Sequence, residues 1–80
     1  MRKMDESLLR KCSELTQTLL RKGVTIGKYL AAAEGADGET VRKLFEYRNR
    51  LAHGLEVQSV TETEMQSWLV VLDSEIKKNS

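Results

Sequence analysis

The chain has 80 residues, with 13 Lys and Arg, 12 Asp and Glu, one His and one Cys, and a formal net charge of +1. A chain of this length forms one small domain, so residues 1–80 are expected to fold as a single unit. One cysteine excludes an intramolecular disulfide, and one His with one Cys cannot supply a four-ligand zinc site, so no metal is expected. The near-neutral charge argues against a strongly basic nucleic-acid clamp but allows a local basic patch.

Regular helices and a partner subunit are the two remaining ways to stabilise so short a chain. Proline is absent, aromatic residues make up 5% of the sequence and charged residues 31%, which favours helices over a β-sandwich or barrel. No run approaches the ~18 apolar residues of a membrane span. The N-terminus lacks the apolar core of a signal peptide, and an unpaired cysteine suits a reducing compartment. We therefore expect a cytoplasmic protein that has no membrane partner.

Two helices are predicted in the first half of the chain. Residues 5–22 place apolar side chains on one helical stripe and end before Gly23, a typical residue just past a helix C-terminus. The stripe consists of Met4, Leu8, Cys12, Leu15 and Leu19. Residues 25–34 form the second helix, with Thr25 as its expected N-cap and with Gly27 weakening its first turn by about 1 kcal/mol relative to Ala.

Two further helices are predicted in the second half. Residues 36–38, Ala-Asp-Gly, are typical of a turn, which places the third helix at residues 39–52. Residues 55–60 are expected to be a connector, and two overlapping capping boxes, at 59–62 and 61–64, precede a fourth helix that runs to about Lys78. The predicted fold class is therefore all-α, a small four-helix bundle of up-and-down-like form.

Arg48 is out of place in the third predicted helix. On a helical wheel it lies about 20° from Val41, in the middle of the apolar arc that also holds Leu44 and Phe45. A guanidinium keeps its charge and is costly to bury without a partner. We therefore expect Arg48 to face a charged partner, a ligand or a cleft between subunits. The alternative is that its stem packs on the core while its head reaches a carboxylate or a carbonyl.

The only histidine, His53, follows Arg48 by five positions. In an ideal helix these two side chains are about 140° apart, whereas Asn49 and His53 share a face. Because Gly54 comes next, the helix can end at His53 and let the ring turn back toward Arg48. Two other arrangements stay open: the two groups meet those of a second subunit, or His53 is an ordinary surface or capping histidine.

Residues 47–54, Tyr-Arg-Asn-Arg-Leu-Ala-His-Gly, resemble the signature of HEPN domains. These small helical domains occur in bacterial toxins, antiphage systems, RNA-guided effectors and some eukaryotic RNA-processing enzymes. Their signature is an Arg, often followed by Asn or His, and a His after a short spacer. Arg48, Asn49 and His53 fill these places, and the resemblance covers roughly residues 41–76.

The resemblance implies a metal-independent endoribonuclease that works as a homodimer and needs no cofactor. The RNA 2′-OH would attack its own 3′ phosphate in a cleft between two subunits. His53 would be the general acid or base, Arg48 would bind the phosphate, and Asn49 would orient His53 or hold a phosphate oxygen. The partners implied are RNA, a second copy of the chain and, for a toxin, a cognate antitoxin or a larger protein.

Two other function classes stay open from the sequence. One is a non-catalytic helical interaction module. The other is a helix-turn-helix DNA-binding protein through residues 30–50, where Ala31, Gly35 and Val41 have the spacing of that motif. Acidic Asp37 and Glu39 would repel phosphate there and argue against it. The residues expected to contact nucleic acid are Arg42, Lys43, Tyr47 and Arg50. The alternative role of Tyr47 is packing in the core. The alternative for the three basic residues is an ordinary solvated surface.

Overall fold

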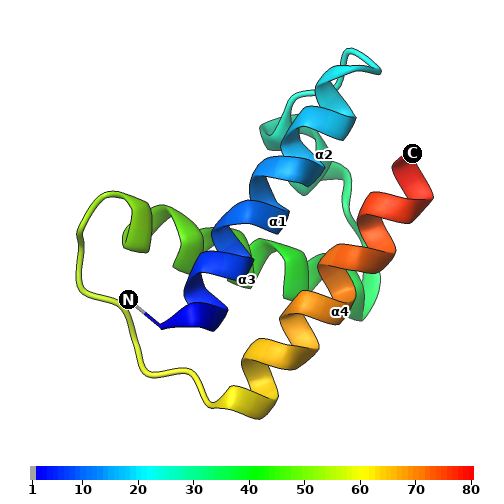
Figure 1. Cartoon of the computed structure of the whole chain (residues 1–80). Helices are drawn as coiled ribbons and strands as arrows, with labels where there is room; N and C mark the ends of the chain where they lie inside the picture. The colour runs from blue at the N-terminus through cyan, green and yellow to red at the C-terminus, as the bar shows by residue number, and fades with distance from the viewer. Residues whose placement is uncertain (1) are drawn as a thin grey trace.

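The structure, a computed structural model, describes residues 2–80 and contains four helices (Figure 1). They are α1 (Lys3–Leu20), α2 (Ile26–Ala32), α3 (Gly35–Ala52) and α4 (Glu62–Asn79). No strand occurs in this part of the chain. The predicted all-α class and the four-helix bundle are confirmed.

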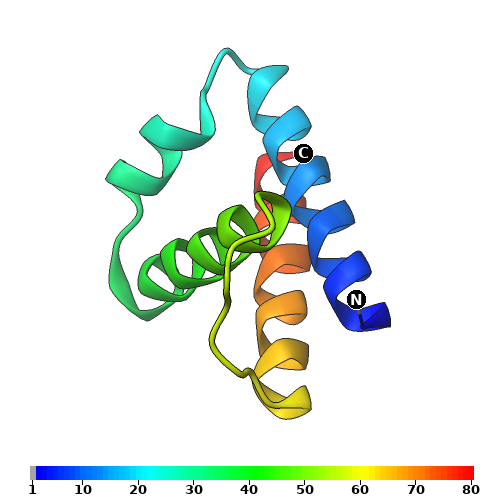
Figure 2. The ribbon, with the colours of Figure 1, turned by 90° about the vertical axis from the view of Figure 1, so that its left-hand side faces the viewer.

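Helices α1 and α4 lie side by side and run in the same direction, and α3 crosses them (Figures 1 and 2). An ion pair between Lys11 of α1 and Asp73 of α4 joins the two neighbours across their surface. The short α2 links the end of α1 to the start of α3, and none of its residues is fully buried. The connector from α3 to α4 passes down the face of the bundle that is turned toward the viewer in Figure 2 and reaches the start of α4.

The core is built from the apolar faces of α1, α3 and α4, together with one residue of the connector. Its members are Leu8, Cys12, Leu15, Leu19, Val41, Leu44, Phe45, Tyr47, Val60, Met65, Trp68 and Leu72. The stripe predicted for the first helix is confirmed from Leu8 to Leu19, and Met4 packs partly buried at its margin. Cys12 is fully buried, as expected for a core residue rather than a surface thiol.

Thr25 is confirmed as the cap of α2, and of the two overlapping capping boxes predicted before α4, the one that starts at Thr61 supplies the cap, whereas Ser59 does not. The Thr25 side chain accepts the backbone N–H of Lys28 at 3.3 Å, and the Thr61 side chain accepts that of Glu64 at 3.1 Å. Each bond satisfies one of the N–H groups that a helix start leaves without a partner.

The start predicted for the third helix is wrong. Helix α3 begins at Gly35 instead of residue 39, so residues 36–38 are helical and do not form a turn. The reversal is confined to Ala33 and Glu34, because Gly35 adopts a φ of +74°, a conformation open to glycine and strained for other residues. The backbone N–H of Gly38 then donates to the Glu34 carbonyl at 3.3 Å and closes the first turn.

Gly38 packs closely against Ala33, the residue that follows α2, and Gly38→Ala is expected to destabilise the protein. A Cβ atom at this residue would lie 2.8 Å from the carbonyl carbon of Ala33, which is backbone and cannot rotate away. We expect a loss of about 1–3 kcal/mol in the free energy of unfolding, measured by urea denaturation. The matched control is Gly27→Ala in α2, where a Cβ would meet nothing within 4 Å and should stabilise by ~0.5–1 kcal/mol. Equal effects of the two substitutions would contradict the close approach.

Candidate functional site

Arg48 lies in the last third of α3 and is half-buried. Its Nη1 donates a hydrogen bond to Oδ1 of Asn49 at 2.8 Å, whereas its buried Nε has no hydrogen-bond partner. In residues 2–80 no carboxylate lies within ion-pair distance of its guanidinium. The chain therefore provides Arg48 with a neutral amide and no counter-charge.

The positive charge of Arg48 influences the pKa of the Cys12 thiol in α1. Burial raises the pKa of Cys12 to about 12, and the positive charge of Arg48 partly opposes this rise. The thiol is thus protonated at neutral pH and is unsuited to nucleophilic chemistry. Cys12 therefore offers Arg48 no negative charge.

His53 ends α3 as its C-cap and is exposed. Its backbone N–H donates to the Asn49 carbonyl at 3.1 Å, and Gly54 follows with a φ of +68° that turns the chain away from the helix axis. The predicted end of the helix is confirmed. In the described chain the imidazole makes no hydrogen bond to Arg48, so the structure joins Arg48 to Asn49 and leaves the His53 ring open to solvent.

Two of the basic residues expected at nucleic acid are attached to the protein's own backbone. Arg42 donates through Nη1 to the carbonyl oxygens of Leu30, at 3.0 Å, and of Ala33, at 2.8 Å, at the C-terminal end of α2. Arg50 donates through Nε to the Glu56 carbonyl at 2.8 Å and so fixes the connector against α3. Arg42 and Arg50 are nevertheless exposed residues, and Lys43 is exposed as well.

Tyr47 packs in the core, which is the role that the sequence offered as the alternative to contact with nucleic acid. Its side chain is 6% exposed and meets the Trp68 ring edge-to-face, with 5.5 Å between the ring centroids. Its hydroxyl donates to Oδ1 of the buried Asp5 at 2.9 Å and accepts a long bond from Arg2 at 3.5 Å. Burial first, and then the bond to Asp5, raises the pKa of Tyr47. Arg2 also donates to the Val60 carbonyl at 3.1 Å, so this network joins α1, α3 and the connector.

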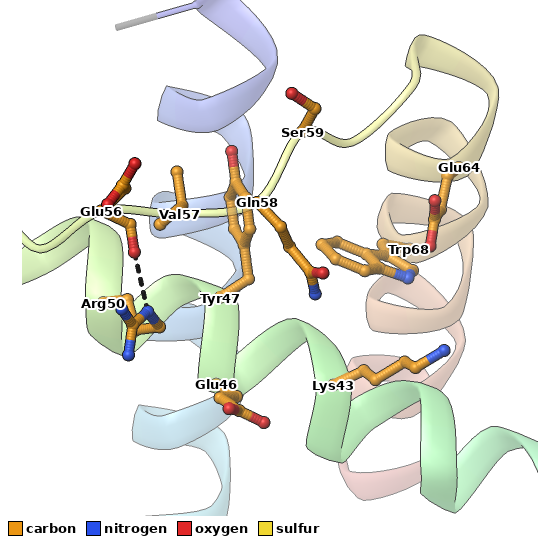
Figure 3. Close-up of a pocket in the computed structure, with 10 residues that line it drawn as sticks. All are labelled: Lys43, Glu46, Tyr47, Arg50, Glu56, Val57, Gln58, Ser59, Glu64 and Trp68. Atoms are coloured by element: carbon orange, nitrogen blue, oxygen red, sulfur yellow. Dashed lines mark hydrogen bonds between the residues drawn. The ribbon is translucent and has the colours of Figure 1, made fainter.

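A cavity of about 630 Å³ lies between α3, the connector and α4 (Figure 3). It was not expected from the sequence, because its walls come from three separate segments. Its lining consists of Lys43, Glu46, Tyr47, Arg50, Glu56, Val57, Gln58, Ser59, Glu64 and Trp68. Three residues that were expected to contact nucleic acid line this cavity, namely Lys43, Tyr47 and Arg50. The predicted catalytic residues Arg48, Asn49 and His53 do not line it.

A second cavity, of about 360 Å³, lies between α2 and α3 and includes Asn49 in its wall. Its other lining residues are Leu30, Ala31, Arg42, Phe45, Glu46 and Arg50. Glu46 and Arg50 line both cavities and therefore form the ridge of α3 that separates them. The structure thus places Asn49 next to a groove whose two cations are Arg42 and Arg50.

Within residues 2–80, no three His, Cys, Asp or Glu residues gather closely enough to hold a metal ion. Among the same residues, no helix combines the length and the apolar character needed to cross a bilayer. Comparison with family models, with curated proteins and with solved structures yields no match to this chain.

Proposed function

We propose that the protein is a HEPN-like, metal-independent endoribonuclease in which Arg48 binds the scissile phosphate and His53 transfers a proton. The observation that carries the proposal is the half-buried guanidinium of Arg48, whose Nε has no hydrogen-bond partner. A half-buried cation without a counter-charge costs free energy, and a phosphate bound at the Nη side of the guanidinium would supply that charge, whereas the Nε is buried beyond a ligand's reach.

Asn49 and His53 complete the set of groups that phosphodiester cleavage needs. The amide of Asn49 already bonds Arg48 at 2.8 Å, so it can hold the guanidinium toward a phosphate or bond a phosphate oxygen itself. The exposed ring of His53 is free to reach a ribose hydroxyl. Attack by the 2′-OH needs a base, and departure of the 5′ oxygen needs an acid.

A homodimer would supply both groups from one residue type. The chain contains one histidine, whereas a site shared by two copies contains two. Because His53 is exposed at the end of α3, a two-fold arrangement that brings two α3 ends together would set one His53 on either side of the phosphate. One imidazole would then act as base and the other as acid.

A helix-turn-helix role has less support. In that role the start of α3 would enter the DNA groove, but Asp37 and Glu39 are exposed there and would repel phosphate. Arg42, the nearest arginine, donates to the carbonyls of Leu30 and Ala33. Salt-sensitive binding to duplex DNA that depends on Arg42 and Lys43 would favour this role over RNA cleavage.

The proposal is tested by cleavage of a mixed single-stranded RNA in the presence of EDTA. We expect the wild type to produce fragments ending in a 2′,3′-cyclic phosphate and His53→Ala to cleave ~10²–10⁴-fold more slowly, because the proton-transfer group is lost. Gln66→Ala, at an exposed position of α4, is the control and should cleave like the wild type. Equal rates for wild type and His53→Ala would overturn the proposal, and no cleavage by the wild type would favour a non-catalytic module.

The dimer is tested separately by sedimentation equilibrium at micromolar concentration. We expect a mass of twice the 9.1 kDa chain, since the proposed site needs residues from two copies. A stable monomer under the same conditions would rule out the shared cleft.

A further inference from the structure

We propose that the cavity between α3, the connector and α4 receives one base of a single-stranded RNA and prefers bases with an exocyclic amino group to uracil. This inference rests on the proposed function, because it assigns a subsite to the same substrate. A volume of about 630 Å³ lies within the range of roughly 300–1,000 Å³ typical of small-molecule sites.

The inner wall of this cavity is aromatic. Tyr47 and Trp68, 6% and 5% exposed, pack edge-to-face at its base, and the Gln58 side chain extends from the connector toward Trp68 (Figure 3). A flat, mostly apolar ring that carries a few polar groups on its edge fits such a wall. A nucleobase has this form.

The polar groups around the wall determine which base edge fits. The carboxylates of Glu46 and Glu64 and the amide of Gln58 make no side-chain hydrogen bond to the described residues, so they are available to a ligand. Ionised carboxylates accept hydrogen bonds and cannot donate them. Lys43, Arg50, Ser59 and the NH2 group of Gln58 add donors to the lining, but its three carboxylates outnumber its two cations. The lining therefore matches the amino groups of adenine, cytosine and guanine better than the carbonyl oxygens of uracil.

The charges also indicate where the phosphate would lie. Glu46, Glu56 and Glu64 outnumber Lys43 and Arg50 in the lining, so a phosphate is disfavoured inside the cavity and a neutral base is not. Arg50 lies on the ridge of α3 between this cavity and the one that Asn49 lines, so its guanidinium can bind a phosphate between the two cavities. A strand that placed a base in the larger cavity would thus cross α3 toward Asn49 and Arg48.

Trp68 provides the measurement, because it is the only tryptophan of the chain and lines the cavity. The probes are 2′-O-methyl hexanucleotides of adenine, cytosine or uracil, which cannot be cleaved by 2′-OH attack. We expect the adenine and cytosine probes to change Trp68 fluorescence with dissociation constants roughly five-fold lower than that of the uracil probe. Absence of any change at saturating probe, or equal dissociation constants for all three probes, would overturn the inference.

Two variants and one control locate the binding. Gln58→Ala and Glu64→Gln should each bring the ratio of dissociation constants close to one, because each changes the polar edge of the cavity. Gln66→Ala removes a glutamine side chain from an exposed position of α4 outside the cavity and should keep the ratio. Identical ratios for Gln58→Ala and Gln66→Ala would show that the base binds elsewhere.

His53→Ala separates this inference from the proposed function. It should bind the probes with the wild-type preference, because His53 does not line the cavity. Base-selective binding without RNA cleavage by the wild type would retain the base site and reject the enzyme. Cleavage that depends on His53, without base-selective binding, would retain the enzyme and reject the base site.

Discussion

Arg48→Leu is expected to reduce RNA cleavage by ~10³–10⁵-fold and to make the fold more stable. The first effect follows because an arginine that stabilises a phosphoryl transition state contributes a factor of this size. The second follows because the substitution removes a half-buried charge whose Nε has no partner and replaces it with an apolar side chain on an apolar arc. We expect a gain of about 1 kcal/mol in the free energy of unfolding, measured by urea denaturation beside the cleavage assay.

The matched control is Arg10→Leu, at an exposed position of α1 outside the proposed site. It should change the free energy of unfolding by less than about 0.5 kcal/mol and leave cleavage intact. A loss of stability in Arg48→Leu would mean that Arg48 supports the core through its stem and its bond to Asn49. The unpaired charge would then have a structural explanation, and the argument for phosphate binding would fail.

Leu44→Ala in α3 is expected to destabilise the protein strongly. Leu44 is fully buried at the crossing of α3 with the α1–α4 pair, and its loss would leave a cavity that the helices cannot refill. We expect a loss of about 2–5 kcal/mol in the free energy of unfolding. Because a domain of this size has a total of about 4–12 kcal/mol, much of the protein would unfold on mild heating. Thermal denaturation followed by circular dichroism measures the effect.

Leu→Ala at an exposed position is the control, because it removes the same atoms without creating a buried cavity. Leu55 lies in the connector and is 54% exposed, so Leu55→Ala should shift the free energy of unfolding by less than about 0.5 kcal/mol. Similar losses for the two variants would mean that Leu44 is less tightly packed than its burial indicates.

Local sequence signals predicted most of the fold. The apolar period predicted the stripe from Leu8 to Leu19, and the threonine side chains predicted the starts of α2 and α4, because both signals act within one helix turn. The start of α3 was wrong for a local reason as well. Ala-Asp-Gly at residues 36–38 is typical of a turn, but the chain turns earlier, at Ala33 and Glu34, and α3 begins at Gly35 with a positive φ.

The candidate site was predictable only in part. The wheel position of Arg48 shows a charge on an apolar arc, and that charge lacks a partner in the structure. The buried bond from Tyr47 to Asp5 joins residues 42 positions apart, which no local pattern indicates. The cavity of Gln58 and Trp68 likewise depends on how the connector passes between α3 and α4. Such features arise from tertiary packing, which overrides what neighbouring residues indicate.

Because α1 and α4 run in the same direction, their helix dipoles point the same way. Two aligned helix dipoles place their positive ends at one pole, where an anion would ordinarily be attracted. Asp5 and Glu6 occupy the first turn of α1, and Glu62 and Glu64 occupy that of α4, so the chain's own carboxylates compensate for that field. A phosphate therefore gains little at this pole, and attraction of a nucleic-acid backbone would depend on the cations of the side chains rather than on these helix dipoles.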